Sequence, residues 1–165
     1  MTAAGSVTVR PAREPDVHLI YSLIVALAEY EQAPDQVVGT PALLARWLFG
    51  DDPAAEALIA EVDGAPAGFA LFHGTFSTWE CQPGIWLEDL FVLPEQRRFG
   101  VGGALLSHVA KAAVDRGYTR LSWTALDWNE MALSFYRKIG ATVLDEWTNH
   151  RLSGQTLQAV AAGAA

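Results

Sequence analysis

The segment from Ile85 to Arg116 has the residue types of an anion-binding site. An apolar stretch leads into a turn with two arginines, Arg97 and Arg98, and a glycine-rich sequence, Gly100–Gly103, at the start of a helical pattern. Backbone amides at a helix N-terminus have no partner within the helix, and the helix dipole adds partial positive charge there. Glycine lets a phosphate approach the backbone because no side chain intervenes. The sequence therefore predicts a phosphate-binding loop.

The glycine-rich sequence departs from two common phosphate-binding motifs, which argues against the ligands that these motifs bind. A Walker A loop needs Gly-Lys-Ser/Thr at its end, but Gly103 is followed by Ala104 and Leu105. A dinucleotide-binding fingerprint needs Gly or Ala in its last position, and Leu105 stands there instead.

Acidic and phenolic side chains offer proton-transfer chemistry. Glu88 interrupts an apolar strand, and because an unpaired buried carboxylate is costly, a functional role is favoured over a structural salt bridge. Asp89 would point to the opposite face of a regular strand, which favours a structural or supporting role. Tyr136 lies on an apolar helix stripe, so periodicity alone predicts a core tyrosine.

Hydrophobic periodicity predicts the elements that position these residues. The expected strands are Val7–Val9, Ala57–Val62, Ala67–Phe72, Ile85–Leu93, Leu121–Leu126, Thr142–Trp147 and Asn149–Leu152. The expected helices are Glu14–Tyr30, one opened by Pro41, Gly100–Arg116, and one capped by Asn129 that ends at Gly140. Asp63-Gly64 is expected to be a hairpin turn, and Gly74–Gly84 a polar loop. This order predicts an α/β fold, a sheet with helices on its faces, in a single domain over residues 1–165 with 153–165 as a short helix or frayed tail.

Composition excludes several functions. The net charge of -8, from 11 Lys+Arg and 19 Asp+Glu, disfavours a nucleic-acid partner. With Cys81 as its one cysteine, the sequence offers neither an internal disulfide nor a zinc site of several thiolates, and its histidines lack metal-ligand spacing. No apolar stretch is long enough for a membrane span and the first residues do not form a signal peptide, so no membrane partner and a cytoplasmic location are expected.

The pattern Arg97-x-x-Gly100-x-Gly102 directly after a strand resembles the pyrophosphate-binding motif of the GNAT acetyltransferases. Further segments resemble the spermidine/spermine (diamine) N-acetyltransferase branch, and the resemblance extends from about Val7 to Leu152. These segments are Tyr30-Glu31, Phe76–Trp79, Leu87–Val92, Asp127–Glu130, Phe135–Ala141, Glu146-Trp147 and Arg151-Leu152. One departure is Met131, where the branch commonly has proline, and the first turn of a helix accepts either residue.

The resemblance implies the GNAT fold, a mixed sheet whose fourth and fifth strands splay, and acetyl-CoA as cosubstrate for the acetylation of a primary amine. It also implies direct transfer in a ternary complex and a homodimer. Glu88 would be the base and Tyr136 the acid that protonates the leaving thiolate. The residues implied at the cofactor are Leu90, Phe91 and Val92 along the pantetheine, Arg97, Arg98, Phe99, Gly100, Val101, Gly102 and Gly103 at the pyrophosphate, and Asn129, Glu130, Met131 and Ala132 near the thioester. Those implied at the amine are Tyr30, Glu31, Glu88, Ser122, Trp123 and Thr124.

The substrate class stays open at this point between a diamine or polyamine and a lysine-like amino acid such as thialysine. Two alternatives remain, which are an acyl-CoA-binding sensor or scaffold with little turnover, and an acetyltransferase for a peptide or antibiotic amine. The acidic surplus is suited to steering a cationic amine toward Glu31 and Glu88.

Overall fold

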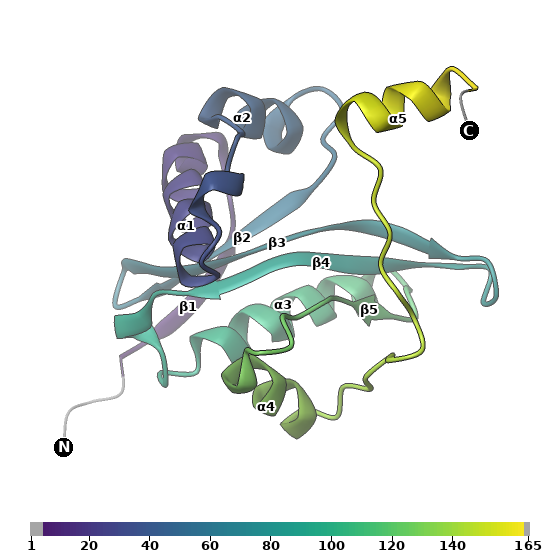
Figure 1. Cartoon of the computed structure of the whole chain (residues 1–165). Helices are drawn as coiled ribbons and strands as arrows, with labels where there is room; N and C mark the ends of the chain where they lie inside the picture. Colours follow the sequence, from purple (N-terminus) through teal and green to yellow (C-terminus); the bar gives the residue numbers. More distant parts are fainter. Residues whose placement is uncertain (1–4, 164–165) are drawn as a thin grey trace. The chain divides into compact units, whose positions relative to one another are not determined.

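A five-stranded sheet in the order β1-β2-β3-β4-β5 forms the frame of the computed structural model, which describes residues 5–163 (Figure 1). Neighbouring strands are antiparallel except for the parallel pair of β4 and β5. The strands are β1 (Val7–Pro11), β2 (Glu56–Val62), β3 (Ala65–Ser77), β4 (Gln82–Val92) and β5 (Leu121–Ser122). The α/β fold with a mixed sheet predicted from the sequence is confirmed.

Contacts divide the chain into two parts, residues 1–124 and 125–165, and each is described by itself. The first part holds the whole sheet, the short 3-10 helices η1 (Glu14–Asp16), η2 (Pro34–Gln36) and η3 (Pro94–Gln96), and three α-helices. These helices are α1 (Val17–Tyr30), α2 (Pro41–Phe49) and α3 (Val101–Asp115). The predicted helix from Glu14 therefore begins with a 3-10 turn, and the other two agree with the expected positions.

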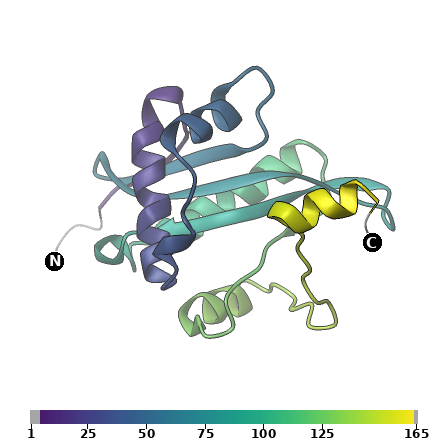
Figure 2. The ribbon, with the colours of Figure 1, turned by 45° about the horizontal axis from the view of Figure 1, so that its top comes forward.

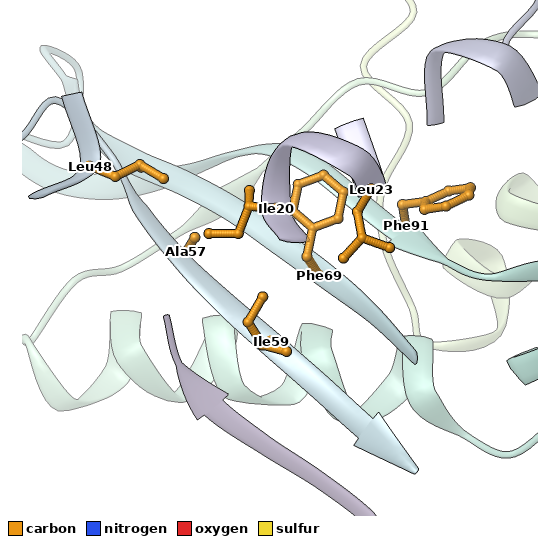
Figure 3. Close-up of a cluster of buried hydrophobic side chains, with 7 residues drawn as sticks. All are labelled: Ile20, Leu23, Leu48, Ala57, Ile59, Phe69 and Phe91. Carbon is orange, nitrogen blue, oxygen red and sulfur yellow. The ribbon is translucent and has the colours of Figure 1, made fainter. Parts of the chain in front are cut away.

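Helices cover both faces of this sheet, with α1 and α2 on one face and α3 on the other (Figures 1 and 2). The face under α1 and α2 holds a core of seven buried side chains (Figure 3), which are Ile20, Leu23, Leu48, Ala57, Ile59, Phe69 and Phe91. On α3 the buried stripe is Val101, Leu105, Leu106, Val109 and Ala113, as the helical spacing predicts.

Both hairpins of the sheet are tight. Asp63 and Gly64 have φ of 50° and 82°, which is the left-handed geometry that joins β2 to β3 in a two-residue turn, as predicted. The predicted loop Gly74–Gly84 is too long, because β3 runs to Ser77 and β4 begins at Gln82, which leaves only residues 78–81 as the turn. Pairing along both strands outweighs the weak strand preference of the glycines in this segment.

A β-bulge interrupts β4 at Glu88. Leu71 of β3 pairs with Asp89, and the next residue, Phe72, pairs with Leu87, so Glu88 is an extra residue on β4. Two residues of β4 then oppose one position of β3, and the alternation of side chains changes phase at this point.

β4 and β5 separate soon after they meet. Their pairing is confined to Ile85 with Leu121 and Trp86 with Ser122, whereas β4 continues to Val92. The prediction of a strand from Leu121 to Leu126 is therefore wrong beyond Ser122, because the chain no longer has β4 beside it to pair with. The separation is the splay expected between the fourth and fifth strands.

The second part contains two helices, α4 (Glu130–Lys138) and α5 (Gly154–Ala161). Asn129 caps α4 as predicted, since its side-chain Oδ1 accepts a hydrogen bond of 3.2 Å from the amide of Ala132. Gly140 follows α4 with φ of 86°, the left-handed conformation that ends a helix. α5 is the short helix expected for the last residues, of which 164 and 165 lie outside the described part.

The late strands predicted at 142–147 and 149–152 are wrong, because the segment 141–153 has no strand in the described structure. Its Val143 and Trp147 are exposed. β-branched and aromatic residues favour a strand, but a strand also needs a neighbouring backbone with which to pair. Among the described residues, no helix is long and apolar enough to cross a membrane.

Candidate active site

The bulge at Glu88 places two adjacent acids on the same face of the sheet. Asp89 pairs with Leu71 and Phe91 pairs with Phe69, and these residues belong to the face that α1 covers. Glu88 lies on this face too, since its Oε2 accepts a hydrogen bond of 3.0 Å from Nε1 of Trp86. Trp86 pairs with His73, and His73 lies on the same face as Leu71 and Phe69 because side chains alternate along β3. The prediction that Asp89 points to the opposite face is wrong, because it assumed a regular strand.

Asp89 is the buried acid of this pair. The pKa of its carboxyl group is raised from 3.8 to about 6, mainly by loss of hydration and in addition by the nearby charges of Glu88 and Glu31. The sequence predicted Glu88 as the buried carboxylate, but 55% of the Glu88 side chain is exposed. A carboxyl group that ionises near neutral pH can both attract a cation and accept a proton from it.

Glu31 joins this acidic cluster from the end of α1. It is the C-terminal capping residue of the helix, and partial burial raises the pKa of its carboxyl group. The ring of Tyr30, the last residue of α1, has its centroid 6.3 Å from that of Phe91, so the end of α1 lies near this part of β4. We refer to Glu31, Glu88 and Asp89 as the carboxylate cluster.

Tyr30 lies on the same face and contacts Arg97. The Arg97 guanidinium lies over the Tyr30 ring at 4.5 Å from its centroid, and over the Phe91 ring at 5.9 Å. Nε of Arg97 donates a hydrogen bond of 3.1 Å to the carbonyl oxygen of Val92. Arg97 therefore connects the loop before α3 to the last turn of α1, and its contact with a pyrophosphate stays a prediction.

The glycine-rich loop has the geometry of an anion site. Gly100 is the N-terminal capping residue of α3 with φ of 83°, a conformation that favours glycine. The first amide that bonds back within this turn is that of Ala104, which donates to the carbonyl of Gly100 at 2.9 Å, so the amides of residues 101–103 precede the first helical bond. A methyl group built on Gly100 or Gly103 would have no atom within 4 Å, so the space beside the loop is open.

The helix side of this loop packs against the sheet at Gly102, whereas Arg98 and Phe99 on its other side are exposed to solvent. A methyl group on Gly102 would contact the side chains of Val92 at 3.8 Å and Leu90 at 3.9 Å, which shows that α3 packs closely on β4 at this point. Arg98 and Phe99 are exposed, and Arg98 has a φ of 74°. The loop thus fits an anionic group in its backbone geometry and in the charge beside it.

Two further sets of predicted residues lie at the splay. The β4 segment predicted along the pantetheine, Leu90–Val92, lies beyond the last pair with β5. Ser122 pairs with Trp86, and Trp123 and Thr124 follow it directly. The structure thus brings Tyr30, Glu31 and Glu88 to the face of the sheet under α1, and Ser122 lies beside β4 at Trp86.

The residues predicted on α4 belong to the second part of the chain. Tyr136 is largely buried, which raises the pKa of its hydroxyl group, so the hydroxyl keeps its proton at neutral pH. Its ring neighbours that of Phe135 with 5.5 Å between centroids. Glu130 forms an ion pair of 3.1 Å with Arg137, and Asn129 caps the helix. The roles of Asn129–Ala132 and Tyr136 stay predictions.

Comparison with known proteins decides the family. The model of the Acetyltransferase (GNAT) family matches residues 20–141, which include strands β2 to β5, the loop before α3, and α4. The chain belongs to the GNAT acetyltransferase family. It is therefore an acetyl-CoA-dependent N-acetyltransferase, as the sequence predicts.

Individual relatives of this acetyltransferase are similar over nearly its whole length. It is 36% identical to the thialysine N-epsilon-acetyltransferase of Bos taurus, covering 94% of this chain and 97% of the relative. It is 30% identical to an L-ornithine N5-acetyltransferase of Arabidopsis thaliana, covering 92% and 86%. A solved structure, an integron cassette protein of V. cholerae, superimposes with a TM-score of 0.77 and 27% identity, covering 94% of this chain and 98% of that one.

Sequence reasoning about this acetyltransferase missed the proximity of His73 and Trp86 to Glu88. Strand pairing brings these side chains together, and neither the spacing of the chain nor its composition encodes that register. The adjacent polar pair Glu88-Asp89 within an apolar strand was the available signal, because two successive polar residues break the period of two and are compatible with a bulge.

Proposed function

We propose that this acetyltransferase transfers the acetyl group of acetyl-CoA to the terminal amine of a small cationic amino acid of the thialysine or ornithine type. A diamine or polyamine is the alternative substrate class. The observation that carries the proposal is the carboxylate cluster, in which burial and the charges of Glu88 and Glu31 raise the pKa of Asp89. The names of the relatives from Bos taurus and Arabidopsis thaliana support the amino-acid class.

The carboxylate cluster suits the first requirement of the reaction, which is recognition of a cation. A primary alkylamine carries a proton at neutral pH, because a lysine-type ammonium group has a pKa of roughly 10.4. Close approach of such a cation to Glu31, Glu88 and Asp89 relieves the repulsion among the three carboxylates.

The second requirement is removal of that proton, since only the neutral amine attacks a thioester. In this proposal Glu88 accepts the proton directly or through water, and Asp89 and Glu31 hold the amine beside it. Tyr30 forms a wall of the site and is itself positioned by the Arg97 guanidinium. Ser122, Trp123 and Thr124 border the amine from the β5 side.

The third requirement is an anion site for the cofactor. The amides of residues 101–103 and the Arg98 side chain would hold the pyrophosphate, and the unpaired edge of β4 at Leu90–Val92 would bond to the pantetheine amides. Acetyl-CoA supplies the activated acetyl group when it is bound. Tyr136, whose hydroxyl remains protonated at neutral pH, would donate a proton to the thiolate that leaves, and Asn129–Ala132 would lie near the thioester.

We also propose that the enzyme is a homodimer in the cytoplasm and that its chain is a single domain. Family resemblance suggests the dimer, and sedimentation velocity of the purified protein tests it. A monomer at micromolar concentration would overturn that part of the proposal.

The amine is tested by amine-dependent release of CoA thiol, measured over thialysine, ornithine, spermidine, putrescine and a peptide N-terminus. We expect the highest kcat/KM with thialysine or ornithine. A preference for spermidine or putrescine supports the alternative, and a preference for the peptide contradicts both. Tight binding of acetyl-CoA without release for any amine would instead identify a cofactor-binding protein with little turnover.

A Glu88→Gln variant tests the role assigned to the base. Glutamine keeps the size of the side chain and accepts the hydrogen bond from Trp86, but it cannot take a proton at neutral pH. Loss of a general base typically costs on the order of 100- to 10,000-fold in rate. An unchanged kcat in this variant would remove Glu88 from the mechanism.

A further inference from the structure

His73 lies on β3 directly opposite Trp86, on the face of the sheet that carries Glu88 and Asp89. Its Nδ1 is 3.0 Å from the carbonyl oxygen of Gly74. A carbonyl can only accept a hydrogen bond, so Nδ1 carries a hydrogen. Nε2 is therefore the ring nitrogen at which a proton is gained and lost.

Nε2 of His73 faces Glu88. It lies 3.6 Å from Oε2 of that carboxylate, a distance at which the protonated ring and the carboxylate form an ion pair. Trp86 donates its hydrogen bond of 3.0 Å to the same oxygen. Side chains from two different strands thus contact Oε2, and 55% of the Glu88 side chain stays exposed and accessible to a substrate amine.

The charged groups around this pair are acidic. Asp89 on β4 and Glu31 at the end of α1 are the other two acids of the carboxylate cluster, and Glu31 and Glu88 both raise the pKa of Asp89. Nε2 of His73 lies against this cluster, where it is placed to receive a proton from Glu88. The His73 side chain is 38% exposed, which gives its ring direct access to solvent.

We propose that His73 acts through Glu88 as the route by which the amine proton leaves the active site. This inference rests on the proposed role of Glu88 as the base. The ammonium substrate gives its proton to the Glu88 carboxylate, which leaves a neutral amine and a carboxylic acid. The acid passes that proton to Nε2 of His73, which restores the carboxylate beside an imidazolium ion. The imidazolium then releases the proton to water or buffer, so each turnover starts from the same protonation state.

A carboxylate alone would perform this cycle less well. Although 55% of the Glu88 side chain is exposed, a bound amine would lie against it, so the proton would have to return to water past the substrate and two more acids. An adjacent imidazole accepts the proton first and delivers it on the solvent side. His73 thus positions Glu88 and returns it to the carboxylate form, without contacting the reacting carbon.

The kinetic test compares His73→Gln with wild type under saturating acetyl-CoA and amine. Glutamine keeps polar contacts at this position but cannot carry a proton. We expect kcat to fall about 10-fold, less than the loss of a direct proton-transfer group, with little change in the KM for acetyl-CoA. Raising the concentration of a small buffer should restore the rate. Added imidazole should restore it in His73→Ala. His108→Gln is the matched control, because His108 also contacts a backbone carbonyl through Nδ1 and lies on α3, away from the cluster.

Two results would overturn the inference. A wild-type kcat and pH profile in His73→Gln would show that the ring transfers no proton. A loss of rate that neither buffer nor imidazole restores would show a structural role only.

A chemical measurement separates this inference from the proposed function. Diethyl pyrocarbonate modifies only the neutral imidazole, so modification of His73 at pH 6, followed by mass spectrometry, reports its protonation. We expect faster modification in Glu88→Gln, because loss of the carboxylate destabilises the imidazolium ion. An equal rate of His73 modification in wild type and Glu88→Gln would refute proton exchange between the two side chains. This measurement does not depend on turnover, so it stays informative even if no tested amine releases CoA.

Discussion

Replacement of Asp89 by asparagine should stabilise the fold while it impairs the enzyme. The Asp89 carboxyl group has a pKa of about 6 in the folded protein against the ordinary 3.8, mainly because it is buried. This difference of about two units corresponds to about 3 kcal/mol of preference for the protonated form in the folded state. Asparagine is neutral at every pH and has the same size, so Asp89→Asn removes the penalty.

The sign of the pH dependence follows from the direction of this shift. A carboxyl group with a raised pKa binds its proton more tightly in the folded than in the unfolded chain, so folding opposes its ionisation. Its contribution is neutral below the unfolded value of 3.8 and becomes unfavourable as the pH rises toward 6. Above that pH the penalty is complete. Relative to wild type, Asp89→Asn should gain up to about 3 kcal/mol at pH 8 and about half of that at pH 5.

Equilibrium urea unfolding at pH 5 and pH 8 measures this difference. The gain at pH 8 corresponds to a rise in the melting temperature of about 6–12 °C for a chain of this size. The difference between the variant and wild type isolates Asp89, because every other titrating group is common to both. Asp52→Asn serves as the control, since Asp52 is exposed and a surface substitution changes stability by less than about 0.5 kcal/mol.

Two results would contradict this expectation: an Asp89→Asn protein no more stable than wild type at pH 8, or an advantage that is the same at both pH values. Either result would mean that Asp89 is hydrated or paired in the folded protein. A kcat/KM for the cationic amine that equals that of wild type would separately remove Asp89 from the amine site.

Three further predictions concern the cofactor and the approach of the substrate. Tyr136→Phe should lower kcat on the order of 100-fold or more with acetyl-CoA affinity unchanged, as turnover and calorimetry would show, and a normal kcat would exclude Tyr136 as the acid. Gly100→Ala should weaken acetyl-CoA binding, because a left-handed residue with a side chain costs about 1–2 kcal/mol and the loop would relax to avoid it. Gly102→Ala should bind acetyl-CoA almost normally, since its methyl group meets Val92 and Leu90 at ordinary contact distances, and the opposite order of affinities would contradict the loop geometry. Salt should lower kcat/KM for a cationic amine, because ions screen the attraction exerted by a protein of net charge -8, and a salt-independent value would assign that charge to solubility alone.

The loop and the helices could be predicted because their signals are local. Gly100 and the apolar stripe of α3 are encoded in consecutive residues, and capping of α4 by Asn129 needs only the first turn of that helix. The two-residue turn at Asp63-Gly64 is equally local. Each of these features depends on backbone preference and helical spacing, so sequence position was sufficient.

The acidic face of the site could not be predicted in the same way. Asp89 was assigned to the wrong face because the extra residue at Glu88 is visible only through pairing with Leu71 and Phe72 of β3. The approach of His73 to Glu88 depends on the same register. The late strands failed for a related reason, because residues 142–152 have suitable composition but form no strand in the described structure.

The bulge at Glu88 also has a consequence for how this sequence can vary. Without the extra residue, Phe91 would leave the core under α1 for the opposite face, and Leu90 and Val92 would take its place. A one-residue insertion or deletion between Leu87 and Phe91 should therefore unfold the centre of the protein. The need to keep Phe91 in the core therefore preserves the bulge. Substitutions of Glu88 and Asp89 can then alter substrate choice during evolution while the backbone that carries them stays fixed.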